Sequence, residues 1–418
     1  MTQTQLTPNT VYVIGTGEVA KAALYKLVKL YPEQAITVVA SNRSGGLDLL
    51  KENVNSDLHA GHINFRQLDV FNKTDELAEL IQSTATDTPQ VLFNLGSPYL
   101  DMKLMQVALD THSHYVDTAC YEELDTKGFS YKQQLALAPE FEKRGLKALL
   151  GGGGSPGITN LLTRFHDAKR ACESVKIFDY NGGLQNKYPW ATNFAAEDNL
   201  KELDNPAKFL RDGEWTEAPA FSERFHIVDP LNIGDDVEVG FNTIYHEEQE
   251  TINMVFPHIR NIYNYMSFGE DYIKYFKLFR DLGLLGVEPV SDGQGGEIIP
   301  IRFLSSLMPH PRDVAPLVTG PAGMRVESAG ENSAEMDLIS VWRMRHEDCW
   351  ADTHTGAVAW STGVPACLFL DALLRFDGNG IFVPENLPNL NNTLFTELSD
   401  TYGLEVDSFD IAGQKVEL

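Results

Sequence analysis

Short apolar runs and helical patterns alternate along the first third of the chain. Val11–Ile14 is an apolar run with β-branched residues that ends at Gly15, as a buried parallel strand would. Apolar residues then recur at helical spacing through 19–30, until Tyr31-Pro32 ends the helix. Ile36–Ala40 is a second buried strand, so strand, helix and strand take about 30 residues, the size of one βαβ unit.

The same alternation continues as far as residue 150. We expect strands at 65–70, 91–95, 114–116 and 147–150, and helices at Thr74–Gln82, 100–111 and 135–144. Pro139 lies in the last of these helices, where it is tolerated near the first turn or at a kink. This order predicts an α/β domain over residues 1–152, built on a Rossmann-type, doubly wound parallel sheet.

The pattern changes after the glycine-rich segment at 151–157. Strands become polar and alternating, as at 175–180 and 237–244, and the loops lengthen. We therefore expect residues 153–355 to form an α+β domain with a mixed or antiparallel sheet, whose strands could pair across a dimer interface. Residues 356–374 are apolar in a helical pattern, so we expect 356–418 to pack back on the first domain, with the last forty residues as a surface tail.

Composition narrows the class of protein. The chain has 418 residues, of which 43% are hydrophobic, and a formal net charge of −26, which indicates a globular protein with two domains. The negative charge argues against a nucleic-acid partner; it could attract a cationic substrate or serve solubility. No apolar stretch approaches the ~18 residues that cross a bilayer. The N-terminus lacks a signal-peptide pattern and the four cysteines are far apart, so we expect free thiols and a cytoplasmic protein.

The segment after the first strand has the pattern of a dinucleotide-binding turn. It reads Gly15-Thr16-Gly17-Glu18-Val19-Ala20, which is G-x-G-x-x-A between a strand and a helix. The first glycine allows the tight turn, the second lets the backbone approach a pyrophosphate, and Ala20 lets helix and strand pack closely. N–H groups at the helix start then hold the phosphate charge.

The end of the second strand favours NADP over NAD. An NAD site usually places an acidic residue there for the ribose 2′-hydroxyl, but this chain has Ser41, Asn42, Arg43 and Ser44. Arg43, with Ser41 nearby, suits a 2′-phosphate; the alternative is that Arg43 is a solvated loop residue. Further expected cofactor contacts come from later strand ends and turns: Asp69, Val70, Gly96, Ser97 and Pro156.

Six further segments resemble the saccharopine dehydrogenase family, and within it the carboxynorspermidine (carboxyspermidine) dehydrogenases. They occur in the family's order: NLGSPY at 94–99, YVDTACYE at 115–122, GSPGITN at 154–160, ATNF at 191–194 after NGG at 181–183, YHEE at 245–248, and TGVPA at 362–366. Two residues depart from the family's pattern. Ser155 stands where Asp is frequent, and Cys120 stands where the carboxynorspermidine branch often has Asn.

The resemblance implies a Rossmann domain followed by a substrate-binding and dimerisation domain, and an oxidoreductase that acts on CH–NH groups. In the carboxynorspermidine branch, a diamine (1,3-diaminopropane or putrescine) condenses with aspartate semialdehyde, and NADPH reduces the resulting imine in polyamine biosynthesis. The alternatives are a glutamate-forming saccharopine dehydrogenase of lysine metabolism and a catalytically silent NADP-binding relative. We expect amine and semialdehyde substrates as small-molecule partners, no nucleic-acid or membrane partner, and a homodimer.

The expected site residues lie at the carboxyl ends of the sheet strands and in the second domain. Asp117, Glu122 and His246 are the candidate catalytic residues, for proton transfer or for binding an ammonium group. The candidate substrate-binding residues are Tyr99, Tyr121, Ser155, Asn181, Lys187, Thr192 and Asn193. The competing interpretations are a structural cap for Asp117, a surface position for Lys187 and a hydrogen-bonded sheet histidine for His246. No His, Cys or carboxylate spacing resembles a metal site, so we expect no metal.

Overall fold

A computed structural model describes residues 10–42, 45–85, 87–123, 129–331, 333 and 336–417.

 The gaps inside this range are 43–44, 86, 124–128, 332 and 334–335. The described chain divides into two compact units: unit 1 takes 10–122, 129–161 and 359–403, and unit 2 takes 162–358 and 404–417, together with Glu123.

Unit 1 is built on a parallel sheet with the strand order β17-β6-β5-β4-β1-β2-β3. The strands are β1 (Val11–Ile14), β2 (Ile36–Ala40), β3 (Asn64–Gln67), β4 (Gln90–Asn94), β5 (Ser113–Val116), β6 (Lys147–Leu149) and β17 (Gly380–Phe382). The chain reverses its direction of travel across the sheet between β1 and β4, which is where α/β sheets of this kind bind nucleotides. The predicted doubly wound parallel sheet is confirmed.

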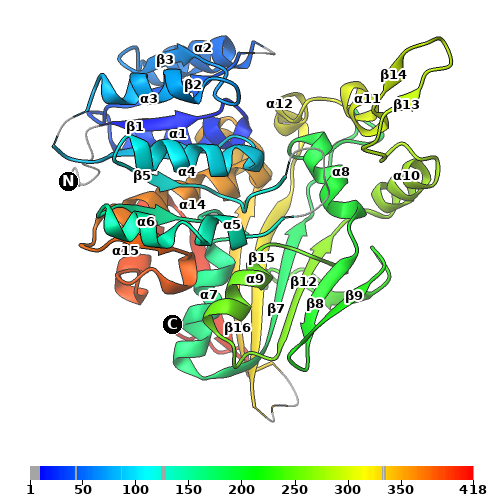
Figure 1. The fold of residues 1–418 in the computed structure, drawn as a ribbon. Helices are drawn as coiled ribbons and strands as arrows, with labels where there is room; N and C mark the ends of the chain where they lie inside the picture. The colour runs from blue at the N-terminus through cyan, green and yellow to red at the C-terminus, as the bar shows by residue number, and fades with distance from the viewer. Residues whose placement is uncertain are drawn as a thin grey trace. The chain divides into compact units, whose positions relative to one another are not determined.

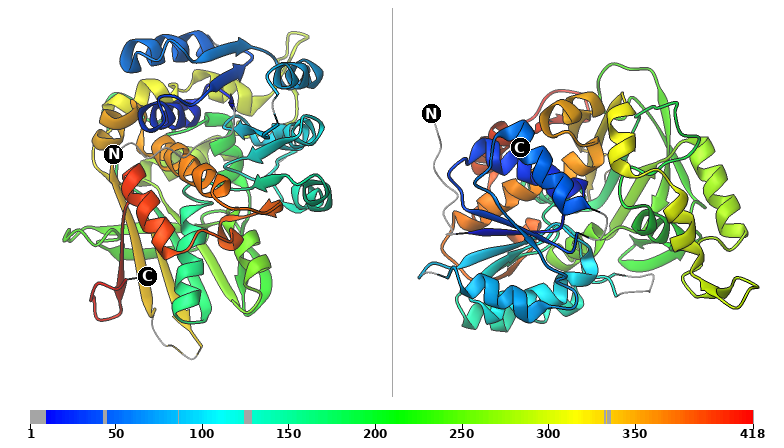
Figure 2. Two further views of the ribbon diagram at one scale, coloured as in Figure 1. Left: turned by 90° about the vertical axis from the view of Figure 1, so that its left-hand side faces the viewer. Right: turned by 90° about the horizontal axis from the view of Figure 1, so that it is seen from above.

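Helices lie on both faces of this sheet (Figures 1 and 2). They are α1 (Glu18–Leu30), α2 (Gly46–Leu58), α3 (Thr74–Gln82), α4 (Asp101–Asp110), α5 (Lys132–Leu135), α6 (Ala138–Lys143), α14 (Ala357–Leu374) and α15 (Asn392–Tyr402), with short 3₁₀ turns η1 (Pro98–Leu100) and η3 (Pro384–Asn386). The helix expected at 135–144 is split, and Pro139 lies in the first turn of α6. Proline fits there because the first turn needs no N–H from it.

Helix α14 is the most apolar helix among the described residues. Its 18 residues have a mean hydropathy of 1.6, so by length and composition alone it could cross a membrane, which corrects our expectation that no such stretch exists. However, 83% of the helix is buried inside the protein. Burial on this scale is the pattern of a core helix in a globular fold.

Unit 2 is built on a mixed sheet with the order β10-β11-β12-β7-β15-β16-β18, and β8 pairs with β12 and β9. The strands are β7 (Cys172–Asn181), β8 (Ala207–Arg211), β9 (Glu214–Ala218), β10 (Arg224–Val228), β11 (Glu238–Ile244), β12 (Asn261–Ser267), β15 (Pro321–Gly330), β16 (Leu338–Arg345) and β18 (Glu405–Asp410). β12 pairs with β7 in parallel, and the other neighbours are antiparallel. The expected mixed or antiparallel sheet is therefore confirmed.

Helices and a small hairpin complete unit 2 (Figure 1). They are α8 (Ala196–Asp204), α9 (Glu248–Val255), α10 (Glu270–Asp281), α11 (Pro300–Leu307), α12 (Pro311–Val314), η2 (Ala315–Leu317), α13 (His346–Thr353), and the hairpin of β13 (Val290–Ser291) and β14 (Glu297–Ile298). Helix α7 (Ile158–Lys169) begins in unit 1 and continues into unit 2. A buried His166 on α7 contacts Ser328 at 2.9 Å and Ser340 at 2.7 Å, which ties the helix to β15 and β16.

The last forty residues are not a surface tail, so that expectation is wrong. They supply β17 to the sheet of unit 1 and β18 to the sheet of unit 2. Their apolar side chains are buried, among them Val383, Leu387, Leu398 and Tyr402. The segment from 356 onward is thus divided between the two units.

Candidate functional site

The turn after β1 is shaped by one strained glycine and one unstrained glycine. Gly15 has φ +110°, and a Cβ there would lie 2.9 Å from both the nitrogen of Gly96 and the carbonyl oxygen of Leu95. The end of β1 therefore approaches the end of β4 at the switch point of the sheet. Gly17, in contrast, has an ordinary φ of −71° and ψ of 178°, and a Cβ there would meet nothing within 4 Å.

The open space at Gly17 fits a bound phosphate. Gly17 is the N-cap of α1, and no side chain caps this helix end. Neither backbone strain nor crowding by the protein requires glycine here, whereas the close approach of a pyrophosphate would. Thr16 and Glu18 flank Gly17, and Val19 lies in the first turn of the helix. These residues can hold the dinucleotide of a nicotinamide cofactor.

Close packing against α14 positions α1, the helix that follows the glycine turn. A Cβ on Gly363 would lie 2.4 Å from the carbonyl oxygen of Val19 and 3.0 Å from Cβ of Ala22. Ala20 is fully buried. Gly363 comes from the TGVPA segment, so that segment contributes by packing against the helix that follows the cofactor turn, and not by a reactive side chain.

The loop after β2 is organised by Asn42, which the sequence reasoning did not single out. Asn42 has φ +58°, and its Oδ1 accepts a hydrogen bond from the nitrogen of Leu47 at 2.9 Å, at the start of α2. The carbonyl oxygen of Ser41 accepts one from Gln67 at 3.4 Å. Arg43 lies outside the described residues, so its predicted role stays a prediction. The sequence feature that could have identified Asn42 is its place a few residues before an apolar helical pattern, where Asn side chains often fix a turn.

The other predicted cofactor residues lie at strand ends of the same sheet. Asp69 follows β3, and its Oδ2 accepts a hydrogen bond from Asn72 at 3.0 Å, while Val70 is buried. Gly96 follows β4; its nitrogen donates to Oδ1 of Asn94 at 3.1 Å, and Ser97 precedes the 3₁₀ turn η1. These positions stay predictions for cofactor contact.

Asp117 is a buried acceptor that fixes the glycine-rich turn. It follows β5 and is 1% exposed. Its Oδ1 accepts a hydrogen bond from the nitrogen of Gly151 at 2.7 Å, and its Oδ2 accepts one from Gln134 at 2.8 Å. Burial raises the pKa of Asp117 to about 8, although these hydrogen bonds and one from Tyr115 oppose the shift. The arrangement matches the competing interpretation of Asp117 as a structural cap.

The predicted neighbours of Asp117 are held by backbone and ring contacts. Tyr121 is half-buried, and its nitrogen donates to Oε1 of Gln134 at 2.9 Å. Glu122 is half-buried and forms a β-bridge with Phe129. Tyr99 packs edge-on against Phe71, with ring centroids 5.6 Å apart. Cys120, one of the two departures from the family pattern, is fully buried, so its side chain lies in the core.

The turn at 151–157 is stabilised by two residues that the sequence reasoning missed as site residues. Oδ1 of Asn160 accepts a hydrogen bond from the nitrogen of Gly157 at 2.8 Å. Nδ2 of Asn160 donates to Oε1 of Glu385 at 2.6 Å, and both side chains are buried. Ser155 is half-buried and Pro156 is buried in this turn. Glu385 belongs to the segment expected to be a tail, and no sequence signal marked it.

In unit 2, Asn181 lies at the end of β7 and pairs with a histidine. Its Oδ1 accepts from the nitrogen of Gly183 at 3.0 Å and lies 3.0 Å from Nε2 of His346. Nδ1 of His346 accepts from the nitrogen of Ala357, so Nε2 carries the proton and donates to Asn181. Burial lowers the pKa of His346 to about 4, which keeps the ring neutral.

The remaining predicted substrate residues differ in their exposure. Lys187 is exposed, with its Nζ 5.0 Å from the ring centre of Tyr188. Thr192 is buried, and its hydroxyl donates to the carbonyl oxygen of Phe194 at 2.9 Å. Asn193 is half-buried. A surface position for Lys187 agrees with the competing interpretation of that residue.

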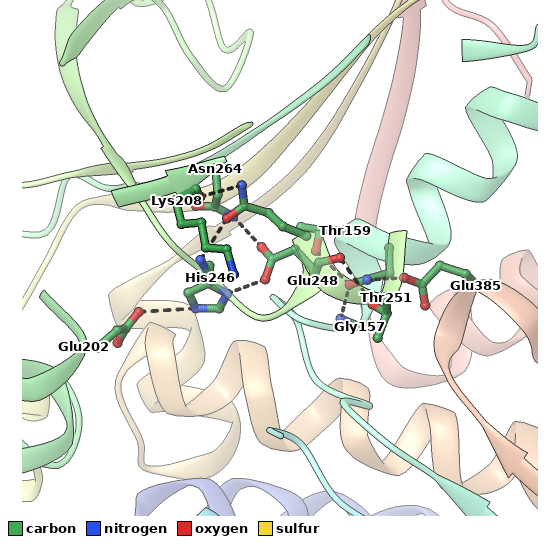
Figure 3. A network of polar contacts seen from close by, with 11 residues as sticks. Gly157, Thr159, Glu202, Lys208, His246, Glu248, Thr251, Asn264 and Glu385 are labelled. Atoms are coloured by element: carbon green, nitrogen blue, oxygen red, sulfur yellow. Dashed lines mark hydrogen bonds and ion pairs between the residues drawn. The ribbon is translucent and has the colours of Figure 1, made fainter. Parts of the chain in front are cut away.

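His246 lies between two carboxylates (Figure 3). It follows β11, where its nitrogen donates to Oε1 of Gln249 at 2.9 Å and so fixes the turn into α9. Its Nδ1 contacts the carboxylate of Glu248, and its Nε2 lies 3.4 Å from Oε1 of Glu202 on α8. The other oxygen of Glu248 accepts a hydrogen bond from Nδ2 of Asn264 on β12.

The charges around His246 favour its protonated form. Burial disfavours the charge, but Glu248, Glu202 and Asp179 outweigh it and raise the pKa of His246 well above its ordinary value. Burial, together with Glu248 and Asp198, raises the pKa of Glu202, and His246 opposes that shift. An imidazolium that can give up a proton and a carboxylate that can take one are thus neighbours.

The structure therefore brings some predicted residues into networks and leaves others apart. Within unit 1, Gln134 joins Asp117 to Tyr121, and Asp117 also accepts a hydrogen bond from Gly151 in the turn at 151–157. Within unit 2, His246 is joined to Glu202, Glu248 and Asn264, which the sequence reasoning did not name as a set. Among the described residues, no group of three or more His, Cys, Asp or Glu side chains could hold a metal ion.

Two family models together match most of the chain. The saccharopine dehydrogenase NADP binding domain matches residues 11–149, and the saccharopine dehydrogenase C-terminal domain matches residues 153–404. The first match covers β1 to β6 of the parallel sheet with the glycine turn, and the second covers β7 to β12, β15 and β16 of the mixed sheet, with His246, and also β17.

Curated relatives and a solved structure agree with these matches. A carboxyaminopropylagmatine dehydrogenase of Synechocystis sp. is 28% identical over 367 residues, which cover 86% of this chain and 87% of the relative. A carboxynorspermidine synthase of Vibrio cholerae is 27% identical over 352 residues, 81% of each chain. The apo saccharopine dehydrogenase (L-Glu forming) of Saccharomyces cerevisiae has the same fold, with a TM-score of 0.68 at 15% identity over 98% of this chain and 100% of that one.

The resemblance inferred from the six sequence segments is confirmed by both family matches. The glycine turn and the strand order of unit 1 fit a nicotinamide dinucleotide. The chain belongs to the saccharopine dehydrogenase family and is an oxidoreductase that uses a nicotinamide cofactor.

Proposed function

We propose that the protein condenses L-aspartate semialdehyde with a diamine and reduces the resulting imine with NADPH, in polyamine biosynthesis. The diamine is 1,3-diaminopropane or putrescine, and the products are carboxynorspermidine or carboxyspermidine. Two observations support this proposal: the names of the relatives that match most of the chain, and the carboxylates that surround His246. The second observation carries it, because a cationic amine needs anionic partners.

The polar residues of unit 2 favour an amine over a substrate with several carboxylates. Glu202 and Glu248 flank His246, and Asp179 and Asp198 add further negative charge. A glutamate-forming saccharopine dehydrogenase handles a substrate with more carboxylates, which calls for arginine or lysine side chains. Lys187, the cation that the sequence motifs offered for this purpose, is exposed and lies over Tyr188.

The chemistry needs a base, an acid and a hydride donor. The incoming ammonium must lose a proton before its nitrogen attacks the aldehyde carbon, and the carbinolamine must gain one so that its hydroxyl leaves as water. The reduced nicotinamide, when bound, supplies the hydride to the imine carbon. The chain's own residues bind and orient the two reactants and move the two protons.

The cofactor in this proposal is NADPH rather than NADH. The side chains described at the end of β2, Ser41 and Asn42, are neutral, and Arg43 follows them. A guanidinium pairs strongly with a 2′-phosphate. The Arg43→Ala variant should therefore lose affinity for NADPH and keep its affinity for NADH, as measured by fluorescence titration. The control is Lys51→Ala, which removes an exposed cation on α2; equal loss for both cofactors in Arg43→Ala would refute the 2′-phosphate role.

Substrate identity is tested by following NADPH absorbance with the purified protein. Aspartate semialdehyde is offered with 1,3-diaminopropane, putrescine or agmatine, the last because of the name of the Synechocystis relative. We expect oxidation of NADPH with a diamine. Activity with agmatine instead would change the amine, and activity with glutamate and aminoadipate semialdehyde would overturn the proposal. NADPH binding without turnover of any pair would identify a catalytically silent relative.

We also propose a homodimer located in the cytoplasm. All four cysteines are buried and free, as a reducing compartment permits. Light scattering on the purified protein tests the dimer, and a monomer mass at micromolar concentration would refute it. Fractionation of cells that express the native protein tests the location.

A further inference from the structure

His246 has two carboxylate neighbours that differ in their surroundings. The side chain of Glu248 is fully buried, and its two oxygens contact Nδ1 of His246 and Nδ2 of Asn264. The side chain of Glu202 is 20% exposed, and that of His246 is 14% exposed. Glu248 is therefore held in place on both sides, whereas His246 and Glu202 keep contact with solvent.

We propose that Glu248, fixed by Asn264, is the positioning residue that directs His246 toward Glu202, and that His246 and Glu202 together form the proton-transfer pair of the reductive condensation. This inference rests on the proposed function for the reaction it serves. The placement of the four side chains is independent of that function (Figure 3).

The hydrogen bonds assign a role to each ring nitrogen of His246. A carboxylate can only accept, so Nδ1 carries the hydrogen that points at Glu248. Asn264 occupies the second oxygen of Glu248 through its amide N–H₂. The ring is thereby held with Nε2 facing Glu202 at 3.4 Å, an ion-pair distance. Contacts between catalytic groups are often this long without substrate and shorten to hydrogen-bond distance when substrate binds.

Groups from several elements face this pair. Glu248 belongs to α9, Glu202 and Asp198 belong to α8, and Asp179 belongs to β7. Lys208 on β8 is the neighbouring cation, and its Nζ lies 4.9 Å from the ring centre of Tyr245. Negative charge dominates, which explains why His246 favours the imidazolium form despite its burial.

The protons balance if the pair works as a relay. Glu202 takes a proton from the incoming ammonium, and the free amine adds to the aldehyde carbon. The C=O π pair moves to the oxygen, and a proton passes from the nitrogen to that oxygen to give the neutral carbinolamine. His246 gives the proton on Nε2 to the hydroxyl of the carbinolamine; the C–O bond breaks, water leaves, and the nitrogen lone pair forms the C=N bond. Glu202 then returns its proton to Nε2, so both groups regain their starting state. After hydride addition, one ammonium, one aldehyde and one hydride have been converted into one secondary amine and one water.

The test is the Glu248→Gln variant, which keeps the size of the side chain and its acceptor for Asn264. Two experiments are performed: kcat and KM are measured across pH with the productive substrate pair, and His246 is titrated by NMR in the protein without substrates. We expect kcat to fall about 100-fold or more, KM to change little, and His246 to titrate at a lower pH than in the wild type. Glu202→Gln, at a more exposed position, should also lower kcat.

The matched control is Glu250→Gln, the same substitution two residues further along α9, where the carboxylate accepts a hydrogen bond from Tyr245 at 2.5 Å. It should leave both the rate and the titration of His246 close to the wild type. A kcat for Glu248→Gln within threefold of the wild type, or an unchanged titration of His246, would overturn the positioning role. Failure of the wild type to turn over any amine and semialdehyde pair would instead overturn the proposed function, and the titrations would still decide where Glu248 directs the ring.

Discussion

Two alanine substitutions in one turn should separate cofactor binding from folding. At Gly17 the backbone is extended and a Cβ meets nothing within 4 Å. Gly17→Ala should therefore leave the fold intact, and should stabilise it by about 0.4–1 kcal/mol because alanine restricts the unfolded chain. The new methyl group would occupy the space in which we place the pyrophosphate. Loss of one hydrogen bond to a charged group costs about 1.5–3 kcal/mol, so the Kd for NADPH should rise about 10- to 150-fold.

Gly15→Ala should have the opposite effect. The left-handed φ of +110° costs about 1–2 kcal/mol for a residue with a Cβ. The contacts of 2.9 Å with Gly96 and Leu95 add about 1–3 kcal/mol of overpacking. The sum, about 2–5 kcal/mol, should appear as a lower midpoint of thermal unfolding without bound cofactor.

The assay is thermal unfolding of both variants and the wild type, combined with a fluorescence titration of NADPH. The reasoning predicts a stable Gly17→Ala variant that binds weakly and a destabilised Gly15→Ala variant. It would be refuted if Gly17→Ala bound NADPH within threefold of the wild type, because the open space would then not be the phosphate site. It would also be refuted if Gly17→Ala unfolded at a markedly lower temperature.

Two further predictions concern buried charge. Arg375→Met should destabilise the protein by about 3–5 kcal/mol in urea unfolding. The substitution leaves the buried carboxylate of Asp371 without the two hydrogen bonds of 2.8 Å that Arg375 donates. A loss of stability below 1 kcal/mol would contradict this prediction. Burial lowers the pKa of His166 to about 3, so the folded state favours the neutral ring. The stability that the neutral ring of His166 contributes is therefore complete above pH 6.5 and is lost as the pH falls toward 3. The free energy of unfolding of His166→Gln should therefore fall less steeply than that of the wild type between pH 6.5 and 4, and equal slopes would argue against a buried neutral histidine.

The parallel sheet of unit 1 was predictable because its strands are short apolar runs between helical patterns. β17 was not, because Gly380–Phe382 is a strand of three residues in a region rich in proline and asparagine. Its position follows from pairing with β6, more than 200 residues earlier in the chain. Local propensity carries no information about such a partner.

In unit 2 the strand pattern itself was ambiguous. β15 begins at Pro321 and contains Gly323 and Gly330, residues that weaken a strand prediction, yet it lies between β7 and β16 in the sheet. A Cβ on Gly323 would lie 2.3 Å from the carbonyl oxygen of Trp342, so this glycine permits a close backbone approach that only the folded sheet reveals.

The candidate site was likewise predictable from the sequence only in part. His246 could be named from its motif, since an imidazole beside two carboxylates suggests proton chemistry. Its partners could not be named, because Glu202 comes from α8 and Asn264 from β12. Asn264 reaches Glu248 because β11 and β12 pair with Ile244 opposite Asn264, a register that the sequence does not display.

The pairing of β17 with β6 has a consequence for synthesis of the protein on the ribosome. At about 5–20 residues per second, the roughly 230 residues from β6 to β17 take on the order of 10–50 s to translate. During that interval the nascent sheet exposes the outer edge of β6, whose N–H and C=O groups await Gly380–Phe382. An unpaired edge is a template for association with other chains. Chaperones that bind nascent chains should therefore engage this protein until Gly380–Phe382 has emerged and paired with β6.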